Sequence, residues 1–244
     1  MRCSIIIPVY NNANFTKSCL DDLMRLSDDY EVIIVDNASS DHTEEVMEGF
    51  KDKEGPRLVY LRNDINTGFG RANNQGYKVS KGDYILFLNN DIRVKDNYTD
   101  WPELLIKHCE DGSIVGAQAG MLDGSFNFVK EGQFDPNQKG AYLSGWCMMA
   151  SRETWDSLIL DQRYNWDTQS MEGKRAGGPW NENYFLYFED GDVSWRVKEN
   201  GGKLIILNDL PLHHFSRVTG KKFNMFHFFH KSRRIFKKDW ANIR

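Results

Sequence analysis

Acidic side chains directly follow strongly apolar segments at three places in this sequence. They are Asp36, the Asp91 that closes an Asn-Asn-Asp triplet, and the carboxylates of residues 189–192. Hard divalent cations such as Mg²⁺ and Mn²⁺ need oxygen ligands, which one carboxylate and a bound diphosphate can supply together. Asp91 is therefore a candidate metal ligand, and the alternative is an Asx turn at the end of a strand.

The segment Glu189-Asp190-Gly191-Asp192 places three carboxylates within four residues. Their mutual repulsion raises the pKa of at least one of them, which suits a general base that deprotonates a hydroxyl group. The alternative is an acidic helix N-terminus, which the helix dipole stabilises without any catalytic role. That alternative fits Asp192 better than the Glu189-Asp190 pair.

Other polar positions could bind a nucleotide. Asp36 could accept a hydrogen bond from the imide N–H of uracil or thymine. His213 or His214 could complete a metal shell, although a lone histidine is more often structural. Arg217 and two nearby lysines could neutralise a diphosphate.

The elements that must position these side chains follow two alternating patterns. Short β-branched runs predict strands, and helical spacing of apolar residues predicts the segments between them. The predicted strands are residues 4–9, 31–35, 58–61, 84–88 and 114–118, and the predicted helices are residues 14–26, 41–50 and 70–79. Asp41-His42-Thr43-Glu44 resembles a capping box. This alternation indicates a parallel sheet covered on both faces, whose ligands bind beyond the carboxyl ends of the strands.

The second half of the chain has a different pattern. Asp123-Gly124 predicts a hairpin turn, residues 142–149 predict one strand, and residues 161–183 predict a long loop. A helix that ends at Asn200 and a strand at residues 204–207 complete the prediction.

Composition and charge exclude several classes of protein. The 244 residues are 40% hydrophobic, as in ordinary globular proteins. From Arg217 onward there are nine Lys or Arg and one acidic residue, whereas the first 216 residues carry a net charge of −12, so a uniformly basic surface for nucleic acid is not expected. No apolar run is long enough to span a membrane, and the N-terminus lacks the pattern of a secretory signal. The four scattered cysteines favour a cytoplasmic location.

Aromatic residues cluster in the second half and in the tail. Trp146, Trp155 and Trp180 lie in the second half, and we expect Trp155 in the core. Residues 223–244 alternate aromatic and basic side chains. A helix docked on the rest of the protein is the favoured interpretation, and an interfacial helix on an anionic membrane is the alternative.

Taken in order, these motifs resemble family 2 glycosyltransferases of the GT-A fold, in particular the bacterial rhamnosyltransferase-like branch. The resemblance rests on residues 4–11, 34–41, 66–74 and 87–91, followed by Gly145, residues 187–192 and residues 214–216. It implies an α/β fold with a Rossmann-like, mostly parallel sheet flanked by helices and a mixed acceptor-binding part. Residues 1–222 would form a single catalytic domain, with a nucleotide-binding half at 1–118, an acceptor half at 119–222, and a separate helix or tail at 223–244.

The expected site combines positions that match the motifs of this family with positions chosen by residue type. The expected donor-binding residues are Pro8, Tyr10, Asp36, Asn37, Gly68, Arg71, Asn73, Asn90 and Arg217. The expected acceptor or sugar pocket contains Gly145, Trp146 and Trp180. Asp190 would be the general base and Glu189 would orient the acceptor or the base, while Asp91 and His214 would bind Mn²⁺ or Mg²⁺. Asn89 stands where many relatives carry Asp, which leaves Asp91 as the single carboxylate that this triplet offers to a metal.

The activity that the resemblance implies is inverting, metal-dependent transfer from a UDP- or dTDP-sugar to a hydroxyl group. The acceptor would be a glycan, a lipid-linked molecule or a protein, with peripheral contact of the tail to the inner membrane face as one option. The alternatives are a catalytically silent nucleotide-sugar or glycan-binding module and a sugar nucleotidyltransferase. The nucleotidyltransferase lacks support because such enzymes usually carry a Gly-rich basic loop after the first strand, whereas Tyr10–Asn14 contains no Gly, Lys or Arg. The sugar, the acceptor and the oligomeric state stay open.

Overall fold

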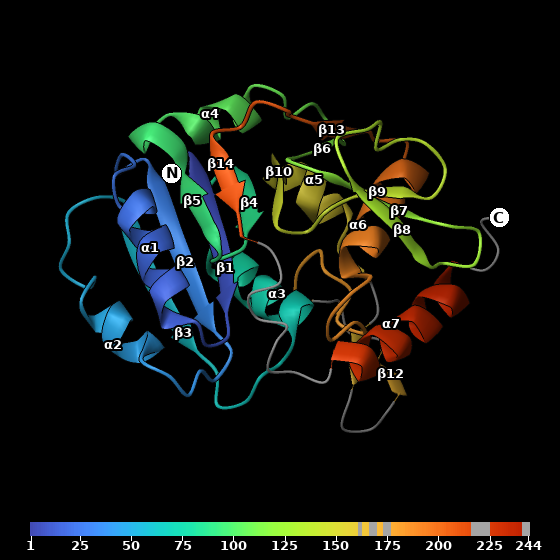
Figure 1. Cartoon of the computed structure of the whole chain (residues 1–244), viewed down its shortest axis with the longest axis horizontal. Coiled ribbons are helices and arrows are strands. Elements are labelled where there is room, and N and C mark those ends of the chain that lie inside the picture. The colour runs from blue at the N-terminus through green and yellow to red at the C-terminus, as the bar shows by residue number, and fades with distance from the viewer. Residues whose placement is uncertain (161–162, 166–169, 173–176, 216–224, 241–244) are drawn as a thin grey trace.

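A computed structural model describes residues 1–160, 163–165, 170–172, 177–215 and 225–240 (Figure 1). Its largest sheet has seven strands in the order β13-β6-β10-β4-β1-β2-β3. Their bounds are Cys3–Val9 (β1), Tyr30–Asp36 (β2), Arg57–Arg62 (β3), Tyr84–Leu88 (β4), Ile114–Gly116 (β6), Cys147–Ser151 (β10) and Leu204–Ile206 (β13). All neighbouring pairs are parallel except those that β10 makes with β4 and β6. The predicted mostly parallel sheet is confirmed.

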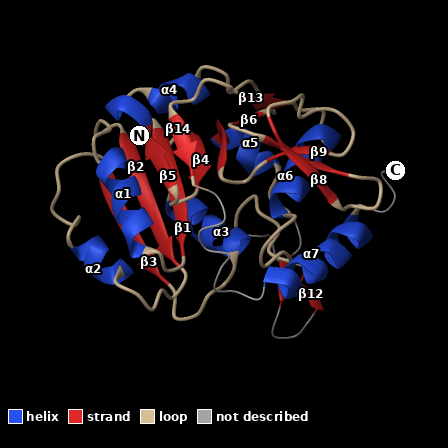
Figure 2. Cartoon of the chain, viewed as in Figure 1, coloured by secondary structure: helices blue, strands red, loops and turns tan. Residues whose placement is uncertain are grey.

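Helices cover both faces of this sheet (Figure 2). The helices are Ala13–Leu23 (α1), Thr43–Glu48 (α2), Phe69–Val79 (α3), Trp101–Ile106 (α4), Arg152–Ser157 (α5) and Glu189–Glu199 (α6). Alternate residues of one strand point to opposite faces. Accordingly, Ile5 and Ile7 pack in the cluster that contains residues of α1, α2 and α4, whereas Ile6 packs in the cluster that contains residues of α3, α5 and α6. Burial on both faces explains why these strands are continuously apolar.

The predicted strand at residues 142–149 is wrong as a single element. The structure divides it into β9 (Ala141–Leu143) and β10, separated by residues 144–146. Strand β9 joins β7 (Ala119–Leu122) and β8 (Phe128–Gly132) in a separate three-stranded sheet, and the predicted hairpin joins β7 to β8. Residues 144–146 therefore lie just before the start of β10 and are not part of the main sheet.

Two predictions for local structure also need correction. Asp41 does not form a capping box with Glu44, because α2 begins at Thr43 and the Asp41 carboxylate accepts the backbone N–H groups of Ala13 and Thr43. The predicted loop at residues 161–183 contains two short paired strands, β11 (Arg163–Asn165) and β12 (Ser170–Glu172). The remaining part of that segment between residues 161 and 176 lies outside the described residues.

A short strand pair brings a late segment of the chain to the centre of the fold. Strand β5 (Ile92–Val94) continues the chain after β4 and pairs antiparallel with β14 (Leu212–His214). His214 lies opposite Ile92 in this register, directly beside Asp91. The pairing therefore joins the end of β4 to residues more than a hundred positions away.

The basic C-terminal helix α7 (Met225–Asp239) is docked beside α6 (Figure 1). Phe236 and Trp240 are buried in a cluster with Phe126 and Phe188. The indole N–H of Trp240 donates to Asp192 at 3.1 Å. This packing supports the interpretation of a docked helix, and none of the described helices is long and apolar enough to cross a membrane.

Candidate active site

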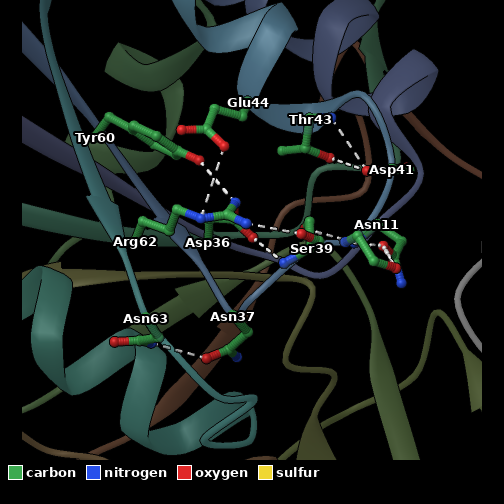
Figure 3. A network of polar contacts seen from close by, with 11 residues as sticks. Asn11, Asp36, Asn37, Ser39, Asp41, Thr43, Glu44, Tyr60, Arg62 and Asn63 are labelled. Atoms are coloured by element: carbon green, nitrogen blue, oxygen red, sulfur yellow. Dashed lines mark hydrogen bonds and ion pairs between the residues drawn. The ribbon is translucent and has the colours of Figure 1, made fainter.

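Asp36 is completely buried at the carboxyl end of β2 (Figure 3). Its Oδ1 accepts the backbone N–H of Ser39 at 2.8 Å, and its Oδ2 accepts the Tyr60 hydroxyl at 2.7 Å and an Arg62 N–H at 2.5 Å. Breaking a buried ion pair leaves an uncompensated charge and costs about 3–5 kcal/mol. The Arg62 guanidinium therefore supports a charged carboxylate at this position.

Asn37 fixes the loop between β3 and α3. Its Oδ1 accepts hydrogen bonds from the side chains of Asn63 and Thr67, and its Nδ2 donates to the carbonyl of Gly68 at 3.1 Å. Gly68 has a φ of 87°, and a Cβ at this position would lie 2.6 Å from the carbonyl oxygen of Phe185. Only glycine fits this close approach, and the Asn37 amide is used within the protein to hold the loop.

The loops that follow β1 and β2 are tied together. Pro8 and Tyr10 are half-buried at the end of β1. Asn11, with a φ of 57°, donates its backbone N–H to Ser39 Oγ and accepts the Ser40 N–H through its side chain, both at 2.8 Å (Figure 3). Positive φ angles at non-glycine residues concentrate at functional sites, because the surrounding structure has to enforce them.

Arg71 and Asn73 lie on α3 at different depths. Arg71 Nε lies 3.4 Å from Glu182 Oε2, so this residue connects the first half of the chain to a loop of the second. Asn73 is completely buried, and neither its amide oxygen nor its amide nitrogen has a hydrogen-bond partner. Such a group is rare inside proteins, and it lies beneath the helix surface rather than on it.

Asp91 and His214 meet where β4 ends. The Oδ1 atom of Asp91 is buried, accepts no hydrogen bond and lies 3.1 Å from His214 Nε2. The Phe215 backbone N–H donates to the Asp91 carbonyl at 2.9 Å, which fixes the two segments together. Neighbouring Asn90 is buried and donates to Thr16 Oγ1 at 2.9 Å, so its amide supports α1.

Trp146 supports His214 from one side. The two rings are stacked with centroids 4.6 Å apart and an interplanar angle of 12°. The Trp146 indole N–H donates to Gln118 Oε1 at 3.0 Å, and its carbonyl accepts the Asn89 N–H. Trp146 therefore fixes the imidazole orientation, while only 8% of its own surface is exposed.

Glu189 and Asp190 begin α6 after two strained residues. Tyr187 and Phe188 both have a φ of 70°. The half-buried Asp190 side chain accepts the backbone N–H groups of Gly191 at 2.8 Å and Gly145 at 3.2 Å. Since a Cβ on Gly145 would lie 3.1 Å from the Asp190 Cβ, a larger residue there would crowd the carboxylate.

The two carboxyl groups differ in their pKa values. Burial, followed by the neighbouring Asp190 charge, raises the pKa of Glu189 well above its ordinary value. Burial raises the pKa of Asp190 to about 6, although the N–H groups of Gly191 and Gly145 stabilise its charged form. Because Glu189 Oε2 is buried without a hydrogen-bond partner and its pKa is raised further, we assign a proton to Glu189 and the negative charge to Asp190.

Two tryptophans and Asp192 have structural positions. Trp180 is fully buried and packs against Phe69 and Phe87, and its role in a sugar pocket stays a prediction. Trp155 is buried in the same core cluster, as expected. Asp192 is bound by Arg196 and by Trp240, which leaves Glu189 and Asp190 as the candidates for chemistry in this segment.

The partners of Asp36 and Trp146 were not predicted from the sequence. Tyr60 and Arg62 complete the surroundings of Asp36, and Gln118 holds Trp146. The adjacency of β2 and β3 could have indicated the first two, because Asp36 lies directly opposite Arg62 in the register. Arg217, an expected donor-binding residue, lies outside the described residues.

A mostly parallel sheet flanked by helices, with carboxylates beyond its strand ends, is the architecture of the GT-A fold. The sequence model described as glycosyl transferase family 2 matches residues 4–171, and the chain belongs to this family. The rhamnosyltransferase-like branch stays a prediction.

Curated relatives match shorter stretches of the chain. It is 37% identical over 71 residues to a poly(ribitol-phosphate) beta-glucosyltransferase of Bacillus spizizenii, which covers 28% of this chain and 11% of that protein. It is 36% identical over 74 residues to a PGL/p-HBAD biosynthesis glycosyltransferase of Mycobacterium bovis, which covers 30% and 28% of the two chains. The matched region thus spans less than a third of either relative.

Solved structures share the fold at low sequence identity. The mannosyltransferase PcManGT from Pyrobaculum calidifontis, in complex with GDP-Man and Mn²⁺, aligns with a TM-score of 0.62 and 17% identity over 86% of this chain and 55% of that chain. Residues 1–349 of TarS from S. aureus, in complex with UDP, align with a TM-score of 0.58 and 18% identity over 86% and 58%. These similarities confirm the GT-A fold.

Proposed function

We propose that this chain transfers a sugar, with inversion, from a UDP- or dTDP-linked donor to a hydroxyl group of a glycan, lipid-linked or protein acceptor. The observation that carries the proposal is the position of Asp190. Its carboxylate accepts the backbone N–H of Gly145, which lies just before β10, and the first residue of β10 pairs with Leu88 at the end of β4, three residues before Asp91. With a pKa of about 6, this carboxylate is mostly ionised at neutral pH and can still take a proton from a hydroxyl.

In the proposed reaction, Asp190 accepts the proton of the acceptor hydroxyl while that oxygen forms a bond to the anomeric carbon. The bond between the anomeric carbon and the diphosphate oxygen breaks on the opposite face, and its electron pair leaves with the nucleoside diphosphate. Attack opposite the leaving group inverts the anomeric configuration. Glu189 keeps its proton because of its raised pKa and leaves Asp190 as the ionised base.

Asp91 and His214 are the residues that we propose to hold Mn²⁺ or Mg²⁺. The Oδ1 atom of Asp91 has no hydrogen-bond donor and faces His214 Nε2, so an oxygen and a nitrogen ligand converge. The described residues contain no group of three or more His, Cys, Asp or Glu that could hold an ion. The donor diphosphate therefore has to supply further ligands, and the bound ion would neutralise charge on the leaving group.

Asp36 is the proposed nucleobase contact. A carboxylate offers about four acceptor sites, and three protein donors already use the two oxygens of Asp36. Uracil and thymine present one imide N–H, whereas guanine presents a ring N–H and an amino group side by side. The remaining capacity of Asp36 therefore favours a base with one donor.

The proposal is tested by nucleotide binding followed by turnover. Thermal shifts with UDP, dTDP and GDP, each with and without Mn²⁺, identify the base because a ligand of the folded state stabilises it by mass action. We expect UDP or dTDP to stabilise the protein and Mn²⁺ to increase the shift. Stabilisation by GDP alone would exclude the proposed base.

Turnover separates an enzyme with this donor from a silent binding module. We expect the sugar donor of the stabilising nucleotide to release nucleoside diphosphate, and the Asp190→Asn variant to lose that release while it still binds nucleotide. Binding without release from any donor would favour the module. We further propose that residues 1–222 form one catalytic domain and that residues 223–244 support it through α7.

A further inference from the structure

A cavity of about 290 Å³ opens beside His214 at the edge of the main sheet. It lies among the segments that follow β6 and β13, the β7–β8 hairpin and strand β14. In open α/β sheets, ligands bind beyond the carboxyl ends of the parallel strands. The cavity occupies that position, and the proposed donor contact Asp36 and its partners Tyr60 and Arg62 do not line it.

The exposed lining of this cavity is mainly polar. Ala117, Leu207, Leu210 and Leu212 are its aliphatic residues and supply the smaller apolar part. A lining of this composition binds a ligand chiefly through hydrogen bonds, in contrast to the mostly apolar pockets that bind many small molecules.

The polar side chains at the rim include no Lys or Arg among the described residues, and the basic groups there are the imidazoles of His213 and His214. Glu131, Gln133 and Asn208 are exposed there, and Gln118 uses its Oε1 for Trp146. Of the described residues that line the cavity, none is Lys or Arg, and Glu131 is the one carboxylate. The rim can therefore pair with hydroxyl groups but offers no guanidinium or ammonium group to a phosphate.

The cavity adjoins both parts of the proposed reaction centre. His214 belongs to its wall and also contacts Asp91. Trp146 is likewise part of the wall and directly follows Gly145, whose N–H donates to Asp190. The Glu131 carboxylate accepts the Ser144 hydroxyl at 3.3 Å and adds a repulsive charge that acts on Asp190.

We propose that this cavity binds the acceptor and that Glu131 selects an uncharged, hydroxyl-bearing sugar unit. This inference rests on the proposed function, because it assigns the second substrate of the same reaction. Glu131 accepts hydrogen bonds from sugar hydroxyls and, with Asp190, repels a phosphate group. The acceptor class thus differs from the phosphorylated polymer in the name of the relative from Bacillus spizizenii.

Binding of small probes tests the acceptor class directly. Saturation-transfer NMR would compare a panel of methyl hexopyranosides with the corresponding 6-phosphates, each with and without UDP and Mn²⁺. We expect the neutral glycosides to bind and the 6-phosphates to bind more weakly. A 6-phosphate that binds as tightly as its neutral counterpart, or no binding of any neutral glycoside, would overturn the proposal.

Two substitutions at Glu131 test whether the glycosides bind in this cavity. We expect Glu131→Gln to weaken glycoside binding roughly tenfold, as for loss of one hydrogen bond to a charged group. Glu131→Lys should narrow or reverse the preference against the 6-phosphates. Exposed Glu153, in the first turn of α5 at the opposite sheet edge, is the matched control, and Glu153→Gln should leave both affinities unchanged.

The outcomes separate this inference from the proposed function. If Glu131→Gln retains its unfolding temperature and binds glycosides as the parent protein does, the assignment of Glu131 is wrong. If no sugar donor releases nucleoside diphosphate while glycosides bind in a Glu131-dependent manner, the proposed transfer fails and the cavity remains a neutral-sugar site. Glycoside binding can be measured without any nucleotide, so the two results are independent.

Discussion

The central carboxylates in the two halves of the site differ in the charges that surround them. Asp36, in the first half, is surrounded by three donors that include the Arg62 guanidinium. Asp190, in the second half, receives backbone N–H groups and lies beside a second carboxyl group, Glu189. The carboxylate that we propose to recognise the donor is thus compensated by a cation, whereas the one that we propose to exchange a proton lacks such compensation. In this proposal, recognition and proton transfer lie at different strand ends of the sheet.

We expect the largest loss of activity from removal of the proposed base, Asp190. Without such a loss, the contrast between Asp36 and Asp190 would not hold. We expect Asp190→Asn to lower the transfer rate about 10²- to 10⁴-fold, the range of general base catalysis, with unchanged affinity for UDP. Product formation and calorimetric titration with UDP measure the two quantities. Asp111→Asn, an exposed change that precedes β6 at the opposite edge, is the control. A fully active Asp190→Asn variant would remove this residue as the base.

Asp91 should affect donor binding only when a metal is present. We expect Asp91→Ala to weaken UDP binding in Mn²⁺ on the order of 10- to 100-fold, the loss seen when a metal site is disturbed. The affinity for UDP in a chelator should change little, because the base contacts at Asp36 remain. Equal Mn²⁺ enhancement in the variant and in the parent protein would contradict the proposed metal site.

Asp36 should affect binding of the base rather than the chemical step. We expect Asp36→Asn to weaken UDP binding roughly tenfold, because a charged acceptor is lost. The rate at saturating donor should remain close to that of the parent protein. The unfolding temperature serves as the control, since the change also removes the partner of Arg62. A reduced rate at saturating donor with unchanged UDP affinity would show that Asp36 acts in the chemical step and not in binding of the base.

The pH profile tests the same contrast without a substitution. Transfer requires ionised Asp190, and its pKa of about 6 means that the ionised fraction falls as the pH decreases through 6. We therefore expect kcat/KM to be constant above pH 7 and to fall about tenfold per pH unit well below pH 6. A profile that stays flat down to pH 4.5 would be incompatible with Asp190 as the titrating base.

We expect the smallest effect on activity from loss of the hydrogen bond that Trp240 donates to Asp192 of α6. Trp240→Phe removes the hydrogen bond to buried Asp192, and we expect a loss of about 1–3 kcal/mol in the free energy of unfolding. Urea denaturation measures this loss, and saturating activity at 25 °C should change little. A stability equal to that of the parent protein would indicate that α7 docks mainly through Phe236 and its aromatic neighbours.

The sequence predicted the sheet well because its signals are local. Residues 4–9, 31–35 and 84–88 are continuous apolar runs, and buried parallel strands require that pattern. The break at residues 144–146 was missed because Trp146 and Cys147 continue the apolar run. The direction change there depends on contacts with β4 and β6, which a local pattern does not contain.

The candidate site was predictable at its strand ends but not in its contacts. Asp91, Asp190 and His214 were chosen by residue type and order, and the structure places them around one edge. The burial of Trp180 and the pairing of Arg62 with Asp36 depend on which side chains meet in three dimensions. A lone Trp or Arg in a sequence gives no sign of its partner, so these two features needed the fold.

The pairing of β14 with β5 also has a consequence for synthesis on the ribosome. His214 reaches Asp91 through residues that are translated more than a hundred positions after β5. A nascent chain that has emerged only through β5 contains Asp36 and Asp91 but neither Asp190 nor His214. We therefore expect a chain that stops before α6 to be unable to cleave a sugar donor, because the later segments complete the proposed catalytic centre.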